Sequence, residues 1–422
     1  MIAGEENYRK VNTILLAVAS VTLFIEFSFP TPGFKLRPFD LILMVLVIQE
    51  IANTDLLKVR KHSIIYYFFF ILFIVYLIVN CTINTDKSTL IKETTQFLEF
   101  GFFAALCHEN LKDREKRSRF IKVFTFGIAI VAIGTALIHM AGGSFYDFKD
   151  FPANKYTFGL LSLVIFWAVI EKKIKRRRLY VAFFISLVLT ILSGERKGWL
   201  ALIMSISVYY VVTIKWKAAL PLILKKKQVL RSALFTFVAI AGLGTIAVLA
   251  QGDNYVSKQM NAVFEIKDLS LDNYKEASTA SNRERLFLIG MALTEFQKEP
   301  IIGIGIDNFV KHLGSIGVDS DSVNDVHNYY LKILVELGLI GFVLFSIFII
   351  SICYLIITAL REIVGSSGEL KEGSLLVMMI FIFGMIENLF LSGKALIIFY
   401  FMFPFGYFLA VRRQINLLKE KS

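Results

Sequence analysis

Residues 324–360 read NDVHNYYLKILVELGLIGFVLFSIFIISICYLIITAL, with a histidine and an asparagine at the start of a long apolar run. A helix of about 20 apolar residues can cross a bilayer core of roughly 30 Å. The chain repeats such stretches along its length, and 56% of its 422 residues are hydrophobic. We therefore expect an all-α, polytopic helical membrane protein, whereas a soluble chain of this length would form two or three domains with polar faces.

The apolar runs predict about twelve transmembrane helices within one integral membrane domain, residues 1–422. The first run, residues 11–29, lacks a small-residue cleavage site, which indicates a retained span and not a cleaved signal peptide. The predicted spans start near residues 11, 39, 63, 89, 119, 156, 179, 198, 232, 329, 373 and 394.

The connectors between these spans alternate in charge. Those at 82–86 and 142–154 are not basic, whereas the basic ones are 57–62, 111–119, 171–178, 215–227 and the tail 412–422. By the positive-inside rule, the basic connectors and both termini are cytoplasmic. The net charge of +12 therefore marks orientation at an anionic membrane surface, and we expect no nucleic-acid partner.

One connector is much longer than the others: residues 251–328, between spans nine and ten, form a large extracytoplasmic loop by this topology. Loops of that length usually carry function. The loop contains a predicted helix, with Ser281 as its N-cap and Glu284 at the capping-box position. Pro300 and the following IIGIG end this helix.

Three polar stretches fall on the predicted outer side and are candidates for chemistry. SGERKGW, residues 193–199, places Arg196 and Lys197 there, against the charge bias. SNRERLF places Arg283 and Arg285 in the first turns of the loop helix, where guanidinium groups and free backbone N–H groups both favour phosphate. The alternatives are side chains that extend to lipid headgroups and arginines that are simply solvated.

His327, the third candidate, would lie in the first turn of span ten at the outer boundary. Asn324 or Asp325 would cap that helix. The helix dipole disfavours imidazolium at this end, and a neutral imidazole is a competent general base near pH 7. A purely structural histidine is the alternative. Glu336 would lie further down the same helix.

Metal chemistry is poorly supported by the sequence. DSDSVND, residues 319–325, has Asn324 where a calcium loop needs glycine and is followed by Tyr330 where the loop needs glutamate. The cysteines show no CxxC or Cys/His spacing. We expect no metal and no cofactor. Acidic residues inside predicted spans remain functional candidates, namely Glu26, Glu99, Glu336 and Glu387.

These stretches, in this order, resemble the O-antigen ligase and Wzy-type polymerase superfamily of bacterial membrane glycosyltransferases. The first motif is matched by Ser193 to Leu200, with Arg196 at the family's arginine position. The second is Arg283 followed by LFLIGMALTEF and EPIIGIGIDNF. The third and most specific, HNxyLxxlxexGliGl, is matched by His327, Asn328, Tyr330, Leu331, Glu336, Gly338, Ile340 and Gly341. Glu195 and Lys197 depart from the smaller residues usual in the first motif.

The resemblance implies a catalytic His327 as general base, with Arg196 and Arg283 binding the pyrophosphate. It implies substrate contacts from Lys197, Arg285, Asn328 and Tyr330. The donor would be an undecaprenyl-pyrophosphate-linked oligosaccharide, and the acceptor another glycan or a lipid. The expected location is the bacterial cytoplasmic membrane, among membrane lipids, with the active site outside. The resemblance also allows for partner proteins of polysaccharide assembly.

Two alternatives stay open. Within the same class, the enzyme would be a ligase that moves the glycan to lipid A core, to protein or to a wall polymer, instead of a polymerase. Outside it, the chain would be a twelve-span transporter or flippase. A transporter predicts related halves and a central charged cavity, and no such repeat is visible in the sequence.

Overall fold

The computed structural model describes residues 2–25, 29–31, 34–52, 61–142, 157–170, 177–192, 196–213, 280–315, 326–363, 369–389 and 398–421. The predicted ninth span, near residue 232, and residues 251–279 of the large loop lie outside the described residues.

The described chain is helical apart from a two-stranded antiparallel hairpin, β1 (Phe29–Thr31) and β2 (Phe34–Leu36), which the apolar pattern did not predict. The helices of the N-terminal half are α1 (Ile2–Thr22), α2 (Pro38–Ala52), α3 (Lys61–Asn84), α4 (Lys87–Asn110), α5 (Arg114–Gly142), α6 (Thr157–Ile170), α7 (Arg177–Leu192) and α8 (Arg196–Thr213). Those of the C-terminal half are α12 (Ala280–Lys298), α13 (Asn308–Ser315), α14 (Tyr329–Ile363), α15 (Glu369–Glu387), a π-helical turn (Ile398–Met402) and α17 (Phe403–Lys421).

Every predicted span except the ninth corresponds to one of these helices, which confirms the fold class. Two boundaries differ from the prediction. The first helix begins at Ile2, ahead of its apolar run, and the basic tail from residue 412 continues α17 as helix through Lys421. Among the described residues, three helices are long and apolar enough to cross a membrane, over Ile65–Asn84, Arg114–Leu137 and Tyr329–Ile363. Shorter apolar segments include Thr157–Ile170 and Gly198–Thr213.

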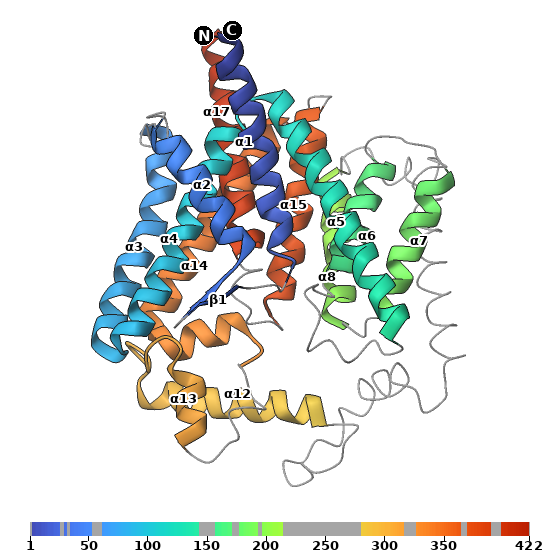
Figure 1. Cartoon of the computed structure of the whole chain (residues 1–422). Helices are drawn as coiled ribbons and strands as arrows, with labels where there is room; N and C mark the ends of the chain where they lie inside the picture. The colour runs from blue at the N-terminus through green and yellow to red at the C-terminus, as the bar shows by residue number, and fades with distance from the viewer. Residues whose placement is uncertain are drawn as a thin grey trace.

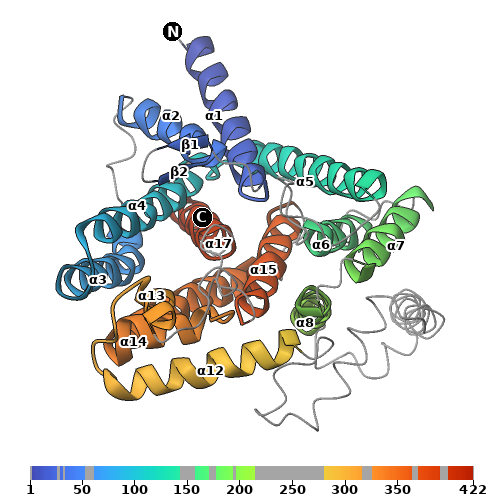
Figure 2. The ribbon, with the colours of Figure 1, turned by 60° about the horizontal axis from the view of Figure 1, so that its bottom comes forward.

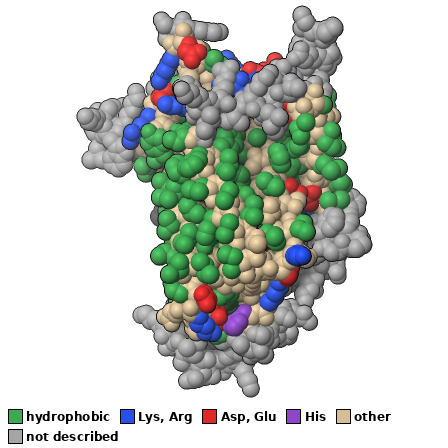
Figure 3. Space-filling view, turned by 90° about the vertical axis from the view of Figure 1, so that its left-hand side faces the viewer, with side chains coloured by type: hydrophobic (Ala, Val, Ile, Leu, Met, Phe, Trp, Pro, Cys, Tyr) green, Lys and Arg blue, Asp and Glu red, His purple; other side chains and the backbone are tan. Residues whose placement is uncertain are grey.

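The surface and the interior are both apolar, as a bilayer environment requires. Ile71, Ile133 and Ile350 are among the exposed hydrophobic side chains, and Figure 3 shows such side chains covering the middle of one face, with charged groups gathered at its two ends. Inside the bundle, the rings of Phe120 and Phe403 stack with their centroids 5.1 Å apart. In lipid, close packing between helices drives their association. Phenylalanine rings packed inside the bundle therefore stabilise it, while isoleucine side chains on its surface can contact lipid.

Buried polar side chains form hydrogen bonds between the N-terminal helices. The amides of Asn12 (α1) and Asn110 (α4) both donate to Glu50 Oε1 of α2, each at 3.2 Å. In an apolar medium such bonds hold helices together because the alternative is an unsatisfied polar group. They fix the N-terminal helices as one rigid block.

Both ends of the chain lie at the same end of the bundle (Figure 1). Helices α12 and α13 lie across the opposite end, and the view in Figure 2 shows α12 running along α14 and toward α8. This layer holds the described part of the predicted large loop.

Candidate active site

The layer of α12 and α13 has a small hydrophobic core of its own. Leu288 and Ala292 of α12 pack in one cluster with Phe309, Leu313, Val326 and Val335. The loop helix is therefore confirmed as a helix that docks on the bundle. Its predicted cap is wrong: α12 begins at Ala280, so Ser281 lies within the helix and does not precede it.

Helix α12 ends at Lys298, and the turn after it binds the backbone of α14 directly. Four backbone hydrogen bonds form this contact: Ile304 N to Val335 O, 3.1 Å; Gly305 N to Glu336 O, 2.9 Å; Leu339 N to Pro300 O, 2.8 Å; and Ile340 N to Ile301 O, 3.2 Å. The motifs EPIIGIG and ELGLIG therefore interlock through their main chains. Local sequence patterns do not reveal such a pairing.

Two glycines allow this close approach. A Cβ atom on Gly303 would lie 2.4 Å from Gly338 N, and one on Gly338 would lie 2.3 Å from Ile301 O. Both have positive φ, 74° and 65°, a conformation that glycine adopts without steric cost. One glycine of the second motif and one of the third are thus explained by the same backbone crossing.

The crossing bends α14. Gly338 has non-helical angles (φ 65°, ψ −171°), so a short helical segment, Tyr329–Leu337, precedes the long one that begins at Leu339. The predicted tenth span is therefore helical through Glu336, and it is interrupted only at Gly338. A sharp bend needs an identifiable cause, and here it is the exchange of helix hydrogen bonds for bonds to residues 300–305.

His327 lies directly before the short segment, in a left-handed backbone conformation (φ 55°). This conformation is uncommon for residues other than glycine and persists only when the surroundings enforce it. Val326 is buried in the α12 cluster on one side. On the other, Asn328 Oδ1 accepts a hydrogen bond from Leu331 N at 3.0 Å, and Tyr329 N donates to Asn388 O at 3.0 Å.

Asn328 is therefore the N-cap of α14. The predicted caps, Asn324 and Asp325, are wrong because the helix begins later than they require; both residues lie outside the described part of the chain. Asn328, predicted to bind substrate, has its side-chain oxygen occupied by this cap. Tyr330, predicted likewise, donates from its hydroxyl to Met385 O at 3.2 Å, within the packing of α14 against α15.

The predicted arginines lie on two other helices. Arg196 and Lys197 begin α8, and Arg283 is in the first turn of α12; their side chains lie outside the described residues. Arg285 is half-buried. It precedes Leu288 by three residues and Ala292 by seven, a spacing that places it on the packed face of α12, and position 283 lies about 200° around the helix from it.

The α7–α8 turn that leads to Arg196 is tied by a tryptophan of the first motif. Trp199 Nε1 donates to Thr190 O at 2.9 Å, across the end of α7. Helix α8 packs along α15, and the carbonyl of Asn388, the residue directly after α15, accepts from Tyr329 N. Helix α15 therefore contacts both the helix that carries Arg196 and the helix that follows His327.

Comparison with known families adds the deciding observation: residues 181–346 match the family model described as O-antigen ligase. This segment is similar to the O-antigen ligase family. The match supports the wider superfamily of O-antigen ligases and Wzy-type polymerases, and with it a membrane glycosyltransferase activity in general terms. No curated protein matches the chain.

The matched segment contains α8, α12, α13 and the bend of α14, and α4, which lies outside the segment, contributes a contact to Asp307. Lys92 of α4 and Lys332 of α14 both contact the carboxylate of Asp307. Asp307 lies two residues after residues 303–305, which we call the GIG turn. Sequence reasoning missed Asp307 and Lys332. The sequence does carry one signal of this contact. Lys92 is a charged residue within a predicted span, and such a residue usually has a partner or a function.

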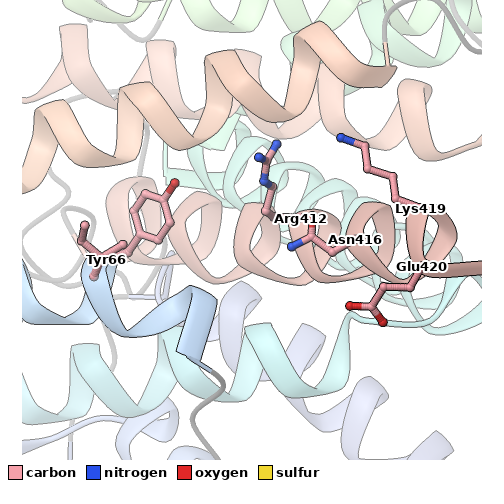
Figure 4. A pocket seen from close by; sticks show the side chains of 6 residues that line it. Tyr66, Arg412, Asn416, Lys419 and Glu420 are labelled. Carbon is pink, nitrogen blue, oxygen red and sulfur yellow. The ribbon is translucent and has the colours of Figure 1, made fainter.

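One of the remaining acids, Glu387, lies near the start of α14, because the next residue, Asn388, accepts from Tyr329 N. Glu387 is buried at the end of α15, and Glu26 lies outside the described residues. Among described residues, no three His, Cys, Asp or Glu side chains gather as a metal site requires. The pocket in Figure 4 is lined by Ile65, Tyr66, Arg412, Asn416, Lys419 and Glu420.

This pocket lies near the termini, at the end of the bundle opposite His327. Its cations are already paired: both Arg412 and Lys419 contact the carboxylate of Glu362, Lys419 at 2.8 Å. Both cations already bind a carboxylate, which competes with a pyrophosphate for them. The candidate active site is therefore the end of the molecule that carries α12 and His327.

Proposed function

We propose that the protein transfers undecaprenyl-pyrophosphate-linked oligosaccharide to a glycan hydroxyl at the outer face of the bacterial cytoplasmic membrane. Repeated use of this reaction polymerises repeat units. The observation that carries the proposal is His327, held in a left-handed conformation where the segment similar to the O-antigen ligase family meets a membrane-spanning helix.

The proposed reaction has one covalent step. His327 takes the proton from the acceptor hydroxyl, and the acceptor oxygen attacks the anomeric carbon of the donor. The bond from that carbon to the pyrophosphate oxygen breaks, and undecaprenyl pyrophosphate leaves with the bonding electrons. Arg196 and Arg283 neutralise the charge that develops on it, since guanidinium groups bind phosphate oxygens in pairs.

The position of His327 suits this chemistry. A polyprenyl chain lies in the bilayer, so its pyrophosphate is held at the membrane boundary. His327 directly precedes the short segment Tyr329–Leu337, and the long apolar segment starts only after Gly338. The bend thus separates His327 and the short segment from the long apolar segment, so that His327 lies at the end of the membrane-spanning part and not within it. The basic connectors support a cytoplasmic location for the termini, which lie at the opposite end of the bundle (Figure 1).

Purified protein given the lipid-linked donor tests the proposal. We expect His327→Ala to abolish transfer while the protein is made and inserted at the wild-type level. His312→Ala is the matched control, because His312 lies in the same layer and contacts Glu295 at 3.0 Å, with no proposed role in catalysis. Transfer by His327→Ala at near the wild-type rate would exclude the general base.

The product distinguishes the two activities of this class. A polymerase converts the donor alone into a ladder of lipid-linked products, whereas a ligase releases undecaprenyl pyrophosphate only when an acceptor such as lipid A core, a protein or a wall polymer is added. We favour the polymerase. A transporter would move the donor across vesicles without forming any new glycosidic bond.

A further inference from the structure

Asp307 connects two parts of the chain that are far apart in sequence. Lys92 Nζ of α4 lies 2.8 Å from Asp307 Oδ2, and Lys332 Nζ of α14 lies 3.4 Å from Asp307 Oδ1. Each lysine also has a second carboxylate, Glu93 at 3.7 Å from Lys92 and Glu336 at 3.9 Å from Lys332. One carboxylate therefore bridges a lysine of the N-terminal half and a lysine of the helix that follows His327.

Further hydrogen bonds join α3 to the same region. They are Tyr76 Oη to Leu337 O, 2.8 Å; Asn80 Nδ2 to Ile302 O, 2.6 Å; and Asn308 Nδ2 to Asn84 O, 2.8 Å. The first two bonds satisfy backbone carbonyls at the bend of α14 and just before the GIG turn, and the third satisfies the carbonyl of Asn84 at the end of α3. The hairpin of α3 and α4, residues 61–110, thus supports the interlocked backbone from the side, although it lies outside the matched range 181–346.

The inner half of the ion bridge is buried, whereas its outer lysine faces solvent. The side chains of Lys332 and Asp307 are 6% and 23% exposed, and Lys92, which is 47% exposed, lies 3.7 Å from the fully buried Glu93. Charges removed from water interact strongly, and taking away one partner leaves the others uncompensated. By contrast, Lys311 and Asp86 form an ion pair at 2.8 Å in which both side chains are 54% exposed. Such exposed pairs contribute little.

We propose that Lys92, Asp307 and Lys332 form an ion bridge that positions His327, so that the α3–α4 hairpin is part of the catalytic machinery. This inference rests on the proposed function, in which His327 is the group that touches substrate. The three bridge residues are positioning residues and take no part in the reaction itself.

The bridge reaches His327 through the first turn of α14. Lys332 N donates to Asn328 O at 2.9 Å, so anchoring Lys332 anchors the cap residue next to His327. Asp307 has a left-handed backbone conformation (φ 59°). The direction of its carboxylate therefore depends on the backbone conformation of the GIG turn that precedes it. A displacement of about 1 Å at a reacting group can lower the rate on the order of 100-fold.

The test compares two lysines at the same interface. Lys92→Met removes the bridge, Lys92→Arg retains the charge, and Lys311→Met is the matched control that removes an exposed pair. Asp307→Asn is the second variant, because asparagine tolerates a positive φ and changes only the charge. If Lys92→Met does not fold, Asp307→Asn still tests the ion bridge.

Two readouts separate this inference from the proposed function. In the donor assay, we expect Lys92→Met and Asp307→Asn to lower kcat about 10- to 100-fold with KM for the donor little changed, Lys92→Arg to recover most of the rate, and Lys311→Met to stay near wild type. In hydrogen exchange, the amides of residues 303–308 and 329–337 should exchange faster in Lys92→Met than in Lys311→Met.

Each outcome decides one question. If wild-type protein forms no glycosidic bond, the proposed function fails, and hydrogen exchange alone still decides whether the bridge holds the turn. Equal exchange in Lys92→Met and Lys311→Met overturns the bridge. Faster exchange with an unchanged kcat in active protein overturns its role in positioning His327.

Discussion

The crossing of Gly303 and Gly338 makes Gly338→Ala the sharpest perturbation of the site. The methyl group would lie 2.3 Å from Ile301 O and 2.5 Å from Gly303 N, both backbone atoms. Flexible side chains could move aside, but here the main chain of residues 300–303 or the bend itself has to shift. The conformation at Gly338 (φ 65°, ψ −171°) is also one that essentially only glycine adopts.

The magnitude follows from these two effects. Holding alanine in that conformation costs about 1–3 kcal/mol. If the clash separates the two segments, four backbone hydrogen bonds are lost, at about 0.5–1.5 kcal/mol each. The loss of local stability is therefore about 1–3 kcal/mol if the bend is held and about 2–6 kcal/mol if the segments separate, concentrated in the GIG turn and the short segment of α14. The main core of the bundle does not include these backbone contacts.

We expect Gly338→Ala to lower kcat by on the order of 100-fold or more, because the segment beside His327 moves. Hydrogen exchange should show opening of residues 300–305 and 329–337 with the exchange of α3 and α5 unchanged. Gly290→Ala is the control: no atom lies within 4 Å of its added methyl group, and alanine favours a helix by up to about 1 kcal/mol over glycine. Wild-type turnover and exchange in Gly338→Ala would refute the interlocked backbone.

Three other predictions concern charge at the pyrophosphate. We expect alanine at Arg196 or Arg283 to lower kcat with the lipid-linked donor on the order of 100-fold. Lysine at either position keeps the charge but loses the planar guanidinium, so we expect it to restore little of that rate. Arg285→Ala should cost much less; a larger loss from it than from Arg283→Ala would transfer the role to the arginine on the packed face of α12. Turnover should also persist in chelator, and activity that vanished and returned with a divalent ion would show that the arginines do not suffice.

The location of the site could be predicted from local patterns, but its construction could not. The third motif marked His327, and the reversal of charge bias marked Arg196 and the loop helix. The cap of α14 was misplaced because Asn324, Asp325 and Asn328 are all good caps by residue type. Only the contact of Val326 with the α12 cluster and of Tyr329 with Asn388 decides where the helix begins.

The sequence by itself determined the class of protein and the course of its helices. A bilayer requires long apolar segments whose backbone bonds are satisfied internally, so composition along the chain is enough to find them. The tertiary structure decided the bend at Gly338 and the ion bridge at Asp307. These depend on contacts such as that of Lys92 with Asp307, 215 residues apart. Periodicity and propensity describe only neighbours in sequence, so pairings at that separation become visible only when the chain is folded.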